Sequence, residues 1–271
     1  MKKTFTKLAL SLLSATLVAS FGTPFVSAQE TISVAVENNS QPLSFTDNTG
    51  ELVGYEIDVL NAIDEQLEDY DFNIEAVSAE ATQVGLDAGR YSFIGGGLFK
   101  TPEREELYAF PEENTGASII RIYKRADDDS IATLDDLSGK VVHPVTPNGG
   151  IFNLLTQYNE ENPDNQIEIQ LGESGSYAQR YQDLHEGVAD AVVLPSNLGQ
   201  DVIIDQLELN VAPVEEPVRV NGTYFVFAQG QDDLIAAFDE AVAALKEDGT
   251  LEEIANEWYG ENVFEYELTE D

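Results

Sequence analysis

The sequence predicts an α/β fold with a largely parallel sheet. Short segments rich in β-branched residues alternate with amphipathic segments of helical period along most of the chain, and this alternation is typical of strand–helix–strand units. Hydrophobic residues make up 42% of the 271 positions. That share is enough to build a core and excludes wholesale disorder.

Residues 31–124 carry the first set of strands and helices. In the first helical segment Ile57, Leu60 and Ile63 fall on one face, as the helical period requires. Three glycines, Gly95 to Gly97, end the third strand. In order, we expect a strand at 31–36, a helix at 54–67, a strand at 72–77, a short helix at 83–88, a strand at 91–97 and a strand at 118–124.

After the acidic run Asp127–Asp129 the pattern starts again. Thr250 and Glu253 form a capping box that begins the last helix. The acidic segment 265–271 is expected to be frayed. In order, we expect a strand at 141–145, a helix at 151–159, a strand at 167–171, a helix at 177–185, strands at 189–194 and 224–228, and helices at 234–245 and 250–260.

Residues 1–28 have the layout of a secretory signal peptide. Three lysines and no acids are followed by a mostly apolar run from Leu8 to Phe21, and Val26-Ser27-Ala28 is a small-residue cleavage pattern. A retained membrane anchor is the alternative, but the run is short and is interrupted by glycine and proline. We therefore expect an exported chain that begins at Gln29.

Composition excludes several classes of function. A net charge of −38 repels phosphate backbones, so a nucleic-acid partner is not expected. The sequence has no Cys, which excludes disulfides and thiolate chemistry. It has two His, and they are not spaced as in the common zinc motifs. We expect neither a metal nor a cofactor. The acidity fits adaptation to a saline or alkaline exterior, and simple solubility is the alternative.

No catalytic motif is present in the sequence. The segment Gly172–Ser176 has the wrong spacing for a nucleophile elbow, and the chain has no phosphate-binding loop. His143 precedes a proline in an expected strand, where packing is the better explanation. We therefore predict that the protein is not an enzyme.

Six stretches follow one another in the order of a known family's motifs. They are P-L-S-F-T-D and G-E-L-V-G-Y-E-I-D within 42–58, L-D-A-G-R-Y at 86–91, T-P-E-R at 101–104, L-D-D-L-S-G-K-V-V at 134–142, G-V-A-D-A-V at 187–192, and D-G-T-L to W-Y-G within 248–260. In these the chain resembles the extracellular solute-binding proteins of polar amino-acid ABC transporters, family 3. Each motif is weak alone, but together they span nearly the whole mature chain.

The resemblance implies a two-lobed type II periplasmic-binding-protein fold. Two mostly parallel sheets would be joined by a two-strand hinge, with residues 29–123 and 224–271 in lobe 1 and residues 124–223 in lobe 2. A small amino acid-like solute would lie between the lobes and be delivered to an ABC permease. The protein would be a monomer, periplasmic or extracellular, held at the cell surface through that permease.

Arg104, in the T-P-E-R motif, is the strongest candidate for a ligand contact. A guanidinium grips a carboxylate with two parallel hydrogen bonds, and by resemblance it holds the α-carboxylate of the ligand. The alternative is a surface ion pair with a neighbouring glutamate. Gly96, Gly97 and Phe99 occupy positions where the family contacts ligand, with packing as the alternative. Lys100 is either a second cation at the rim or a solvated lysine.

Other candidates come from the second lobe and from the end of the first strand. Asn148 and Gly149 precede a helix, so their amides could cap a carboxylate or simply begin the helix. Glu37 and its neighbour Asn38 follow the first strand, where some members of the family contact ligand. For Glu37 a solvated surface acid is the alternative.

Two positions depart from the family. The acid that usually meets the ligand ammonium aligns with Pro195, with Ser196 beside it as a candidate contact. The aromatic residue that often stacks on the ligand aligns near Ala79. These departures leave open a surface adhesin or sensor-type binding module, and a dehydratase-like enzyme on the same fold.

Overall fold

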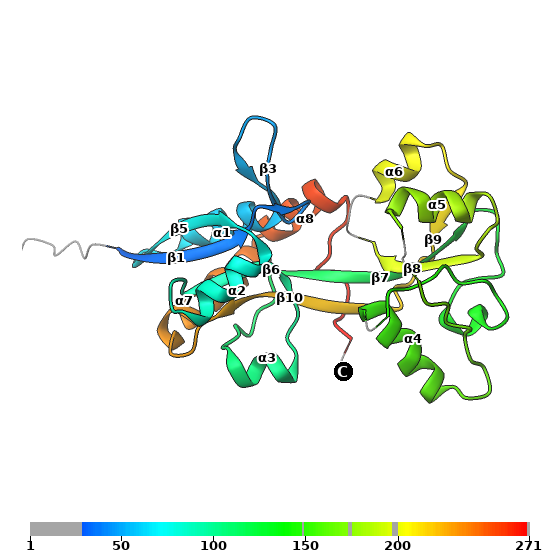
Figure 1. Ribbon diagram of the computed structural model, residues 1–271. Helices are drawn as coiled ribbons and strands as arrows, with labels where there is room; N and C mark the ends of the chain where they lie inside the picture. The colour runs from blue at the N-terminus through cyan, green and yellow to red at the C-terminus, as the bar shows by residue number, and fades with distance from the viewer. Residues whose placement is uncertain (1–28, 148, 173–174, 197–199, 270–271) are drawn as a thin grey trace, which may run out of the picture.

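The computed structural model describes residues 29–147, 149–172, 175–196 and 200–269 (Figure 1). The predicted signal peptide and Asn148 therefore lie outside the described residues. No helix in the described ranges is long and apolar enough to cross a bilayer.

The α/β class and the type II fold are confirmed. The strands are β1 (Glu30–Glu37), β2 (Asn39–Ser40), β3 (Ser44–Thr46), β4 (Leu52–Val53), β5 (Tyr70–Val77), β6 (Phe93–Leu98), β7 (Gly116–Arg125), β8 (Ala191–Pro195), β9 (Val211–Pro213) and β10 (Arg219–Phe227). The helices are α1 (Tyr55–Gln66), α2 (Ala79–Asp87), α3 (Pro102–Leu107), α4 (Gly150–Glu161), α5 (Tyr177–His185), α6 (Gln200–Gln206), α7 (Asp232–Glu247) and α8 (Thr250–Tyr259), with a 3₁₀ turn at Leu134–Leu137.

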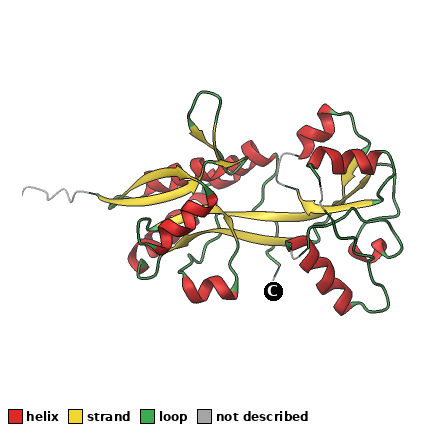
Figure 2. Ribbon diagram, in the orientation of Figure 1, coloured by secondary structure: helices red, strands yellow, loops and turns green. Residues whose placement is uncertain are grey.

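Two long strands connect the halves of the sheet. The strand order is β5-β1-β6-β10-β7-β8, and β9 also pairs with β7. The pairs β5–β1 and β1–β6 are parallel, whereas β10 is antiparallel to both β6 and β7. Figure 2 shows β7 and β10 running from one group of helices to the other. The two expected sheets thus form one continuous path, because the crossing strands pair in both halves.

Separate cores lie at the two ends of that path. At one end Phe93 stacks on Phe227, with ring centroids 4.5 Å apart, and α1, α7 and α8 cover this face. A second cluster covers the opposite face beside α2. At the other end one cluster surrounds Leu155 of α4 and another surrounds Tyr181 of α5. Each end is therefore a sheet with helices on both faces, and burial of its own apolar side chains stabilises it. The lobe boundaries at residues 123/124 and 223/224 remain a prediction.

Several local expectations were wrong. The capping box predicted at Thr250 does not form, because Gly249 is the N-cap of α8 and no side chain caps it. The predicted strands at 141–145 and 167–171 are single bridges, Val142 to Ala191 and Val145 to Leu171, because Pro144 has no N–H with which to continue a ladder. The loop before α1 folds into the small β2-β3-β4 sheet. The tail is not frayed over 265–269, because the Thr269 N–H donates to the Val220 carbonyl at 2.9 Å.

Candidate functional site

A buried carboxylate organises the end of β6. Glu56, in the first turn of α1, is 6% exposed, and its Oε1 accepts the N–H groups of Gly96 (2.8 Å) and Gly97 (2.7 Å). Gly96 and Gly97 have φ values of 134° and 62°, which side chains other than hydrogen rarely allow. Desolvation raises the pKa of Glu56, the two glycine amides lower it, and nearby Glu37 raises it. The amides that we predicted would face a ligand are thus engaged by Glu56.

Glu37 lies beside the same glycine turn. It is the last residue of β1, and a Cβ placed on Gly96 would lie 3.1 Å from the Glu37 Oε1. Asn38 follows it, and its backbone bonds with Val77 and Thr46. Glu37, Asn38, Gly96 and Gly97 therefore gather where the parallel strands β1 and β6 end, the usual place for a ligand in such sheets.

The T-P-E-R motif begins α3. Thr101 is the N-cap, and its Oγ1 accepts the Arg104 N–H at 3.3 Å, while Pro102 occupies the first helical position. This turn folds the Arg104 side chain back, so that its Nη1 donates to the Phe99 carbonyl at 2.9 Å. Within the described residues Arg104 forms no ion pair with a neighbouring glutamate.

Lys100 is held over aromatic rings. Its Nζ lies 5.1 Å from the ring centroid of Tyr224 and 5.9 Å from that of Phe110, and it contacts the Pro111 carbonyl at 3.4 Å. Cation–π contacts at these distances fix an ammonium group while leaving its other N–H bonds available. Lys100 is therefore a positioned cation.

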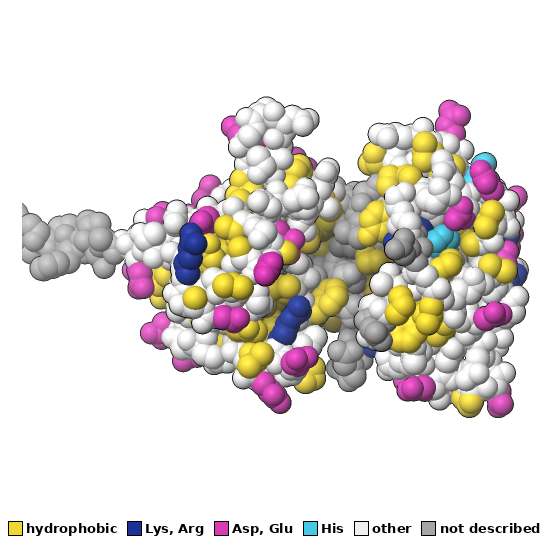
Figure 3. Space-filling model, viewed as in Figure 1, with side chains coloured by type: hydrophobic (Ala, Val, Ile, Leu, Met, Phe, Trp, Pro, Cys, Tyr) yellow, Lys and Arg dark blue, Asp and Glu magenta, His cyan; other side chains and the backbone are white. Residues whose placement is uncertain are grey.

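A cavity of about 510 Å³ lies between the two ends of the sheet, and Figure 3 shows this face of the molecule hollowed between its halves. Its wall combines the loop after β6, the crossing strands, the start of α4, the end of β8 and the C-terminal segment. The lining residues are Phe99, Lys100, Thr101, Ser118, Ile120, Gly150, Ile151, Asn153, Pro195, Arg219, Asn221, Gly222, Tyr224, Leu268 and Thr269. This volume suits a small polar solute.

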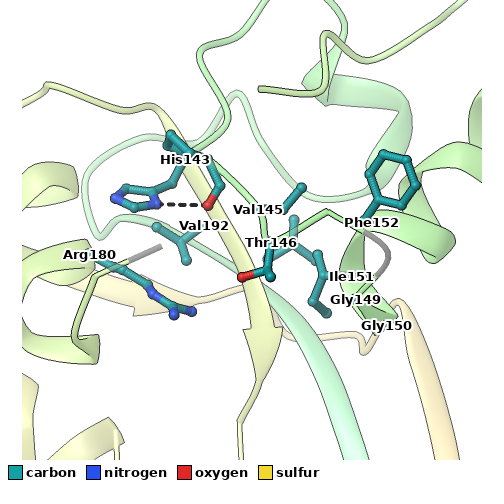
Figure 4. Close-up of a pocket in the computed structure, with 11 residues that line it drawn as sticks. His143, Val145, Thr146, Gly149, Gly150, Ile151, Phe152, Arg180 and Val192 are labelled. Carbon is teal, nitrogen blue, oxygen red and sulfur yellow. Dashed lines mark hydrogen bonds between the residues drawn. The ribbon is translucent and has the colours of Figure 1, made fainter. Parts of the chain in front are cut away.

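Gly149 belongs to a second, smaller cavity of about 170 Å³ (Figure 4). Gly149 and Gly150 begin α4 on one side of it, and Arg180 and His143 lie on the other. His143 is 8% exposed, and its Nε2 lies 3.1 Å from the Asp183 carboxylate. The start of α4 thus borders both cavities, because Gly150 lines each of them.

Ser196 belongs to a network on the crossing strands. Its hydroxyl donates to Glu261 Oε1 at 3.0 Å. Arg121 of β7 donates to Glu261 Oε2 (3.2 Å), to the Tyr266 hydroxyl (2.7 Å) and to the carbonyls of residues 214 and 215. Ser196 therefore ties β8 to the segment after α8, and its oxygen has a protein partner already.

Three aromatic residues near the cleft serve packing. Tyr55 is buried, donates to the Thr115 carbonyl at 2.7 Å and packs on Tyr259 with centroids 4.5 Å apart. The Trp258 indole donates to Asp58 Oδ2 at 2.7 Å and meets Phe45 edge-on. None of these three lines the cavity between the sheet ends in the described part of the chain.

Only part of the predicted set meets at one place. Phe99 and Lys100 line the larger cavity, and Arg104 is joined to it through the Phe99 carbonyl. Gly96, Gly97, Glu37 and Asn38 form the neighbouring strand ends, Gly149 lines the smaller cavity and Ser196 bonds to Glu261. Pro195 also lines the larger cavity, whereas Ala79 is an exposed residue of α2.

Sequence reasoning missed Glu56, Tyr224 and Arg121. The G-Y-E-I-D motif contains Glu56, but its glycine partners are 40 and 41 residues away.

No cluster of His, Cys, Asp or Glu suited to a metal ion occurs among the described residues.

Known proteins are similar to this chain in sequence. The pattern of bacterial extracellular solute-binding proteins, family 3, matches residues 32–261. A probable amino-acid ABC transporter-binding protein of Haemophilus influenzae is 27% identical over 241 residues, covering 88% of each chain. The L-cystine-binding protein TcyJ of Escherichia coli is 25% identical over 88% of this chain and 86% of its own.

A solved structure shows the same fold. The L-cystine solute receptor of Neisseria gonorrhoeae, in its unliganded open conformation, aligns with a TM-score of 0.73 at 21% identity, over 88% of this chain and 96% of its own. The chain belongs to the bacterial extracellular solute-binding proteins, family 3.

Proposed function

We propose that the protein captures an amino acid or amino acid-like solute in the cavity between the two ends of the sheet and passes it to an ABC permease. The observation that carries this proposal is the hydrogen bond from Arg104 to Phe99, a residue that lines that cavity. The Arg104 guanidinium donates to the Phe99 carbonyl and forms no ion pair with a carboxylate among the described residues. A ligand α-carboxylate would replace that single hydrogen bond with a bidentate pair.

Closure of the cleft would follow from the crossing strands. Residues Gly116 to Ile120 of β7 pair with Arg219 to Thr223 of β10, and these strands also bound the cavity. Bending there would bring the start of α4 toward the loop after β6 without breaking either core. A permease could then distinguish the closed, loaded form from the open form.

Binding without turnover fits the chemistry of the cavity. His143, the buried histidine, pairs with Asp183 and lines the smaller cavity instead. We propose that the protein is a monomeric, exported receptor with no enzymatic activity and no nucleic-acid partner. Surface retention would come from the permease.

The test is a thermal-shift screen of the purified protein, in low and in molar salt, against the common amino acids, cystine and non-amino carboxylates. A ligand at a hundred times its Kd stabilises the native state by about 2.7 kcal/mol, so one amino acid class should raise the Tm. Arg104→Ala should weaken that ligand about tenfold or more by removing a charge-assisted pair. Arg90→Ala, a change in an exposed arginine paired with Glu75, is the matched control. A panel without any Tm shift at either salt would refute the proposal.

A further inference from the structure

We infer that the cleft selects a solute of net negative charge, an acidic amino acid or a related dicarboxylate, and that Lys100 binds its second carboxylate. This inference rests on the proposed function and names the class of solute. Arg104, in α3, takes the α-carboxylate in that function, and Lys100 lies in the loop just before that helix with a separate positive charge.

The lining of the cavity is opposite in charge to the rest of the chain. Asp and Glu occupy 51 of the 271 positions, against 13 for Lys and Arg. None of the described residues that line the cavity is Asp or Glu, while Lys100 and Arg219 are both there. Local positive charge in a strongly acidic protein marks the place where an anion is bound, because the surrounding surface repels it.

Lys100 differs from four other cations of this chain in having no ion pair among the described residues. Arg90, Arg121, Arg125 and Lys246 each pair with a carboxylate. Lys100 has no carboxylate partner among the described residues, and its one hydrogen bond is a long contact to a carbonyl. The rings of Tyr224 and Phe110 hold the ammonium in place. A half-buried ammonium with spare donors binds a carboxylate more strongly than a solvated lysine does.

The two acids that act on the Tyr224 hydroxyl do not line the cavity. Glu113 and Glu105 both raise the pKa of Tyr224, after the larger effect of desolvation. Glu113 is bound by Lys246 at 2.7 Å, and Glu105 is exposed on α3. A cationic side chain on the ligand would therefore find repulsion without a lining acid to offset it, which supplies discrimination against arginine and lysine. The Pro195 position adds no charge to meet an ammonium.

The experiment is isothermal titration of the purified protein with L-glutamate, L-aspartate, succinate, L-glutamine, L-cystine and L-arginine. We expect an anionic solute to bind best. Lys100→Met should weaken it about tenfold or more, because a charge-assisted contact is lost, and Lys100→Arg should retain most of the affinity. Lys140→Met is the matched control, since Lys140 contacts Ser130 and does not line the cavity. The Tm of each variant without ligand checks that it is folded.

Each outcome has a distinct meaning. Preference for an anionic solute, lost in Lys100→Met and kept in Lys140→Met, supports the inference. Best binding of glutamine, cystine or arginine, or unchanged anion affinity in Lys100→Met, overturns it and leaves the proposed function standing. If neither these solutes nor the wider panel of the thermal-shift screen binds, the proposed function fails, and this inference fails with it.

Discussion

Replacing Glu56 with alanine is expected to lower the free energy of unfolding by about 3 kcal/mol or more, since each buried donor left without an acceptor costs roughly 1–3 kcal/mol. The two donors are the N–H groups of Gly96 and Gly97, which bond to one carboxylate oxygen. Glu56→Gln keeps an acceptor at that place, so its loss should be much smaller. Urea unfolding of both variants measures the difference.

The same pair of variants carries a pH signature. The folded pKa of Glu56 is raised above its ordinary value of 4.5, chiefly by desolvation. Between pH 4.5 and the higher folded-state pKa, the folded protein keeps a proton on Glu56 that the unfolded chain has lost. The free energy of unfolding therefore falls as the pH rises through this window and levels off above it. Glu56→Gln removes this contribution, and the gap between wild type and variant should change with pH there. Glu65→Ala, an exposed change on the same helix, should move stability by less than about 0.5 kcal/mol. Equal losses in Glu56→Ala and Glu56→Gln would refute the role assigned to the carboxylate.

The second large effect is expected at Arg121. Its side chain is 8% exposed and that of its partner Glu261 is 24% exposed. Replacing Arg121 with methionine leaves that carboxylate without its cationic partner, although the Ser196 and Tyr266 hydroxyls still donate to it, and removes the guanidinium donor to two carbonyls. Breaking a buried pair in this way costs about 3 kcal/mol. It also removes the guanidinium that lies 5.2 Å from the Tyr266 ring centroid. Urea unfolding measures the loss.

Two further variants separate the pair from the packing. The double variant Arg121→Met, Glu261→Gln no longer has an unpaired carboxylate at residue 261. It should therefore recover part of the free energy of unfolding that Arg121→Met loses. Arg90→Met breaks a pair that is 62% and 42% exposed, and it should cost less than about 1 kcal/mol. Amide exchange at Val220, which donates to Thr269 Oγ1, should accelerate in Arg121→Met as the C-terminal segment loosens. If Arg121→Met lowers the free energy of unfolding no more than Arg90→Met does, the stabilising role assigned to the Arg121 network is contradicted.

Sequence patterns predicted those elements whose apolar residues all lie within one segment and form one buried face. The helix α7 buries Leu234, Phe238 and Leu245 at helical spacing, and its period was visible in the sequence. The helix α3 was not predicted, although Thr101 and Pro102 are its N-cap and its first residue. Strands at 141–145 and 167–171 could not be judged in this way, because a ladder depends on its partner as well as on propensity.

Contacts between distant residues account for most of what the sequence did not reveal about the site. Glycines before T-P-E-R indicate a close backbone approach, but what approaches is Glu56, 40 residues earlier. Ser196 stands where a ligand contact was expected, and its partner Glu261 is 65 residues later. A single sequence has no signal for such pairs. Arg104, Lys100 and Phe99 could be named as candidates from the sequence because their neighbours form a local motif.

The position of Trp258, the only tryptophan, determines what intrinsic fluorescence can report. Its indole bonds to Asp58 of α1 and packs against Phe45, away from the cavity lining. Indole emission should therefore follow unfolding of the core that α1 and α8 share and stay constant when a solute binds. Tyr224, whose ring lies in the cavity wall beneath Lys100, is the natural optical reporter of occupancy.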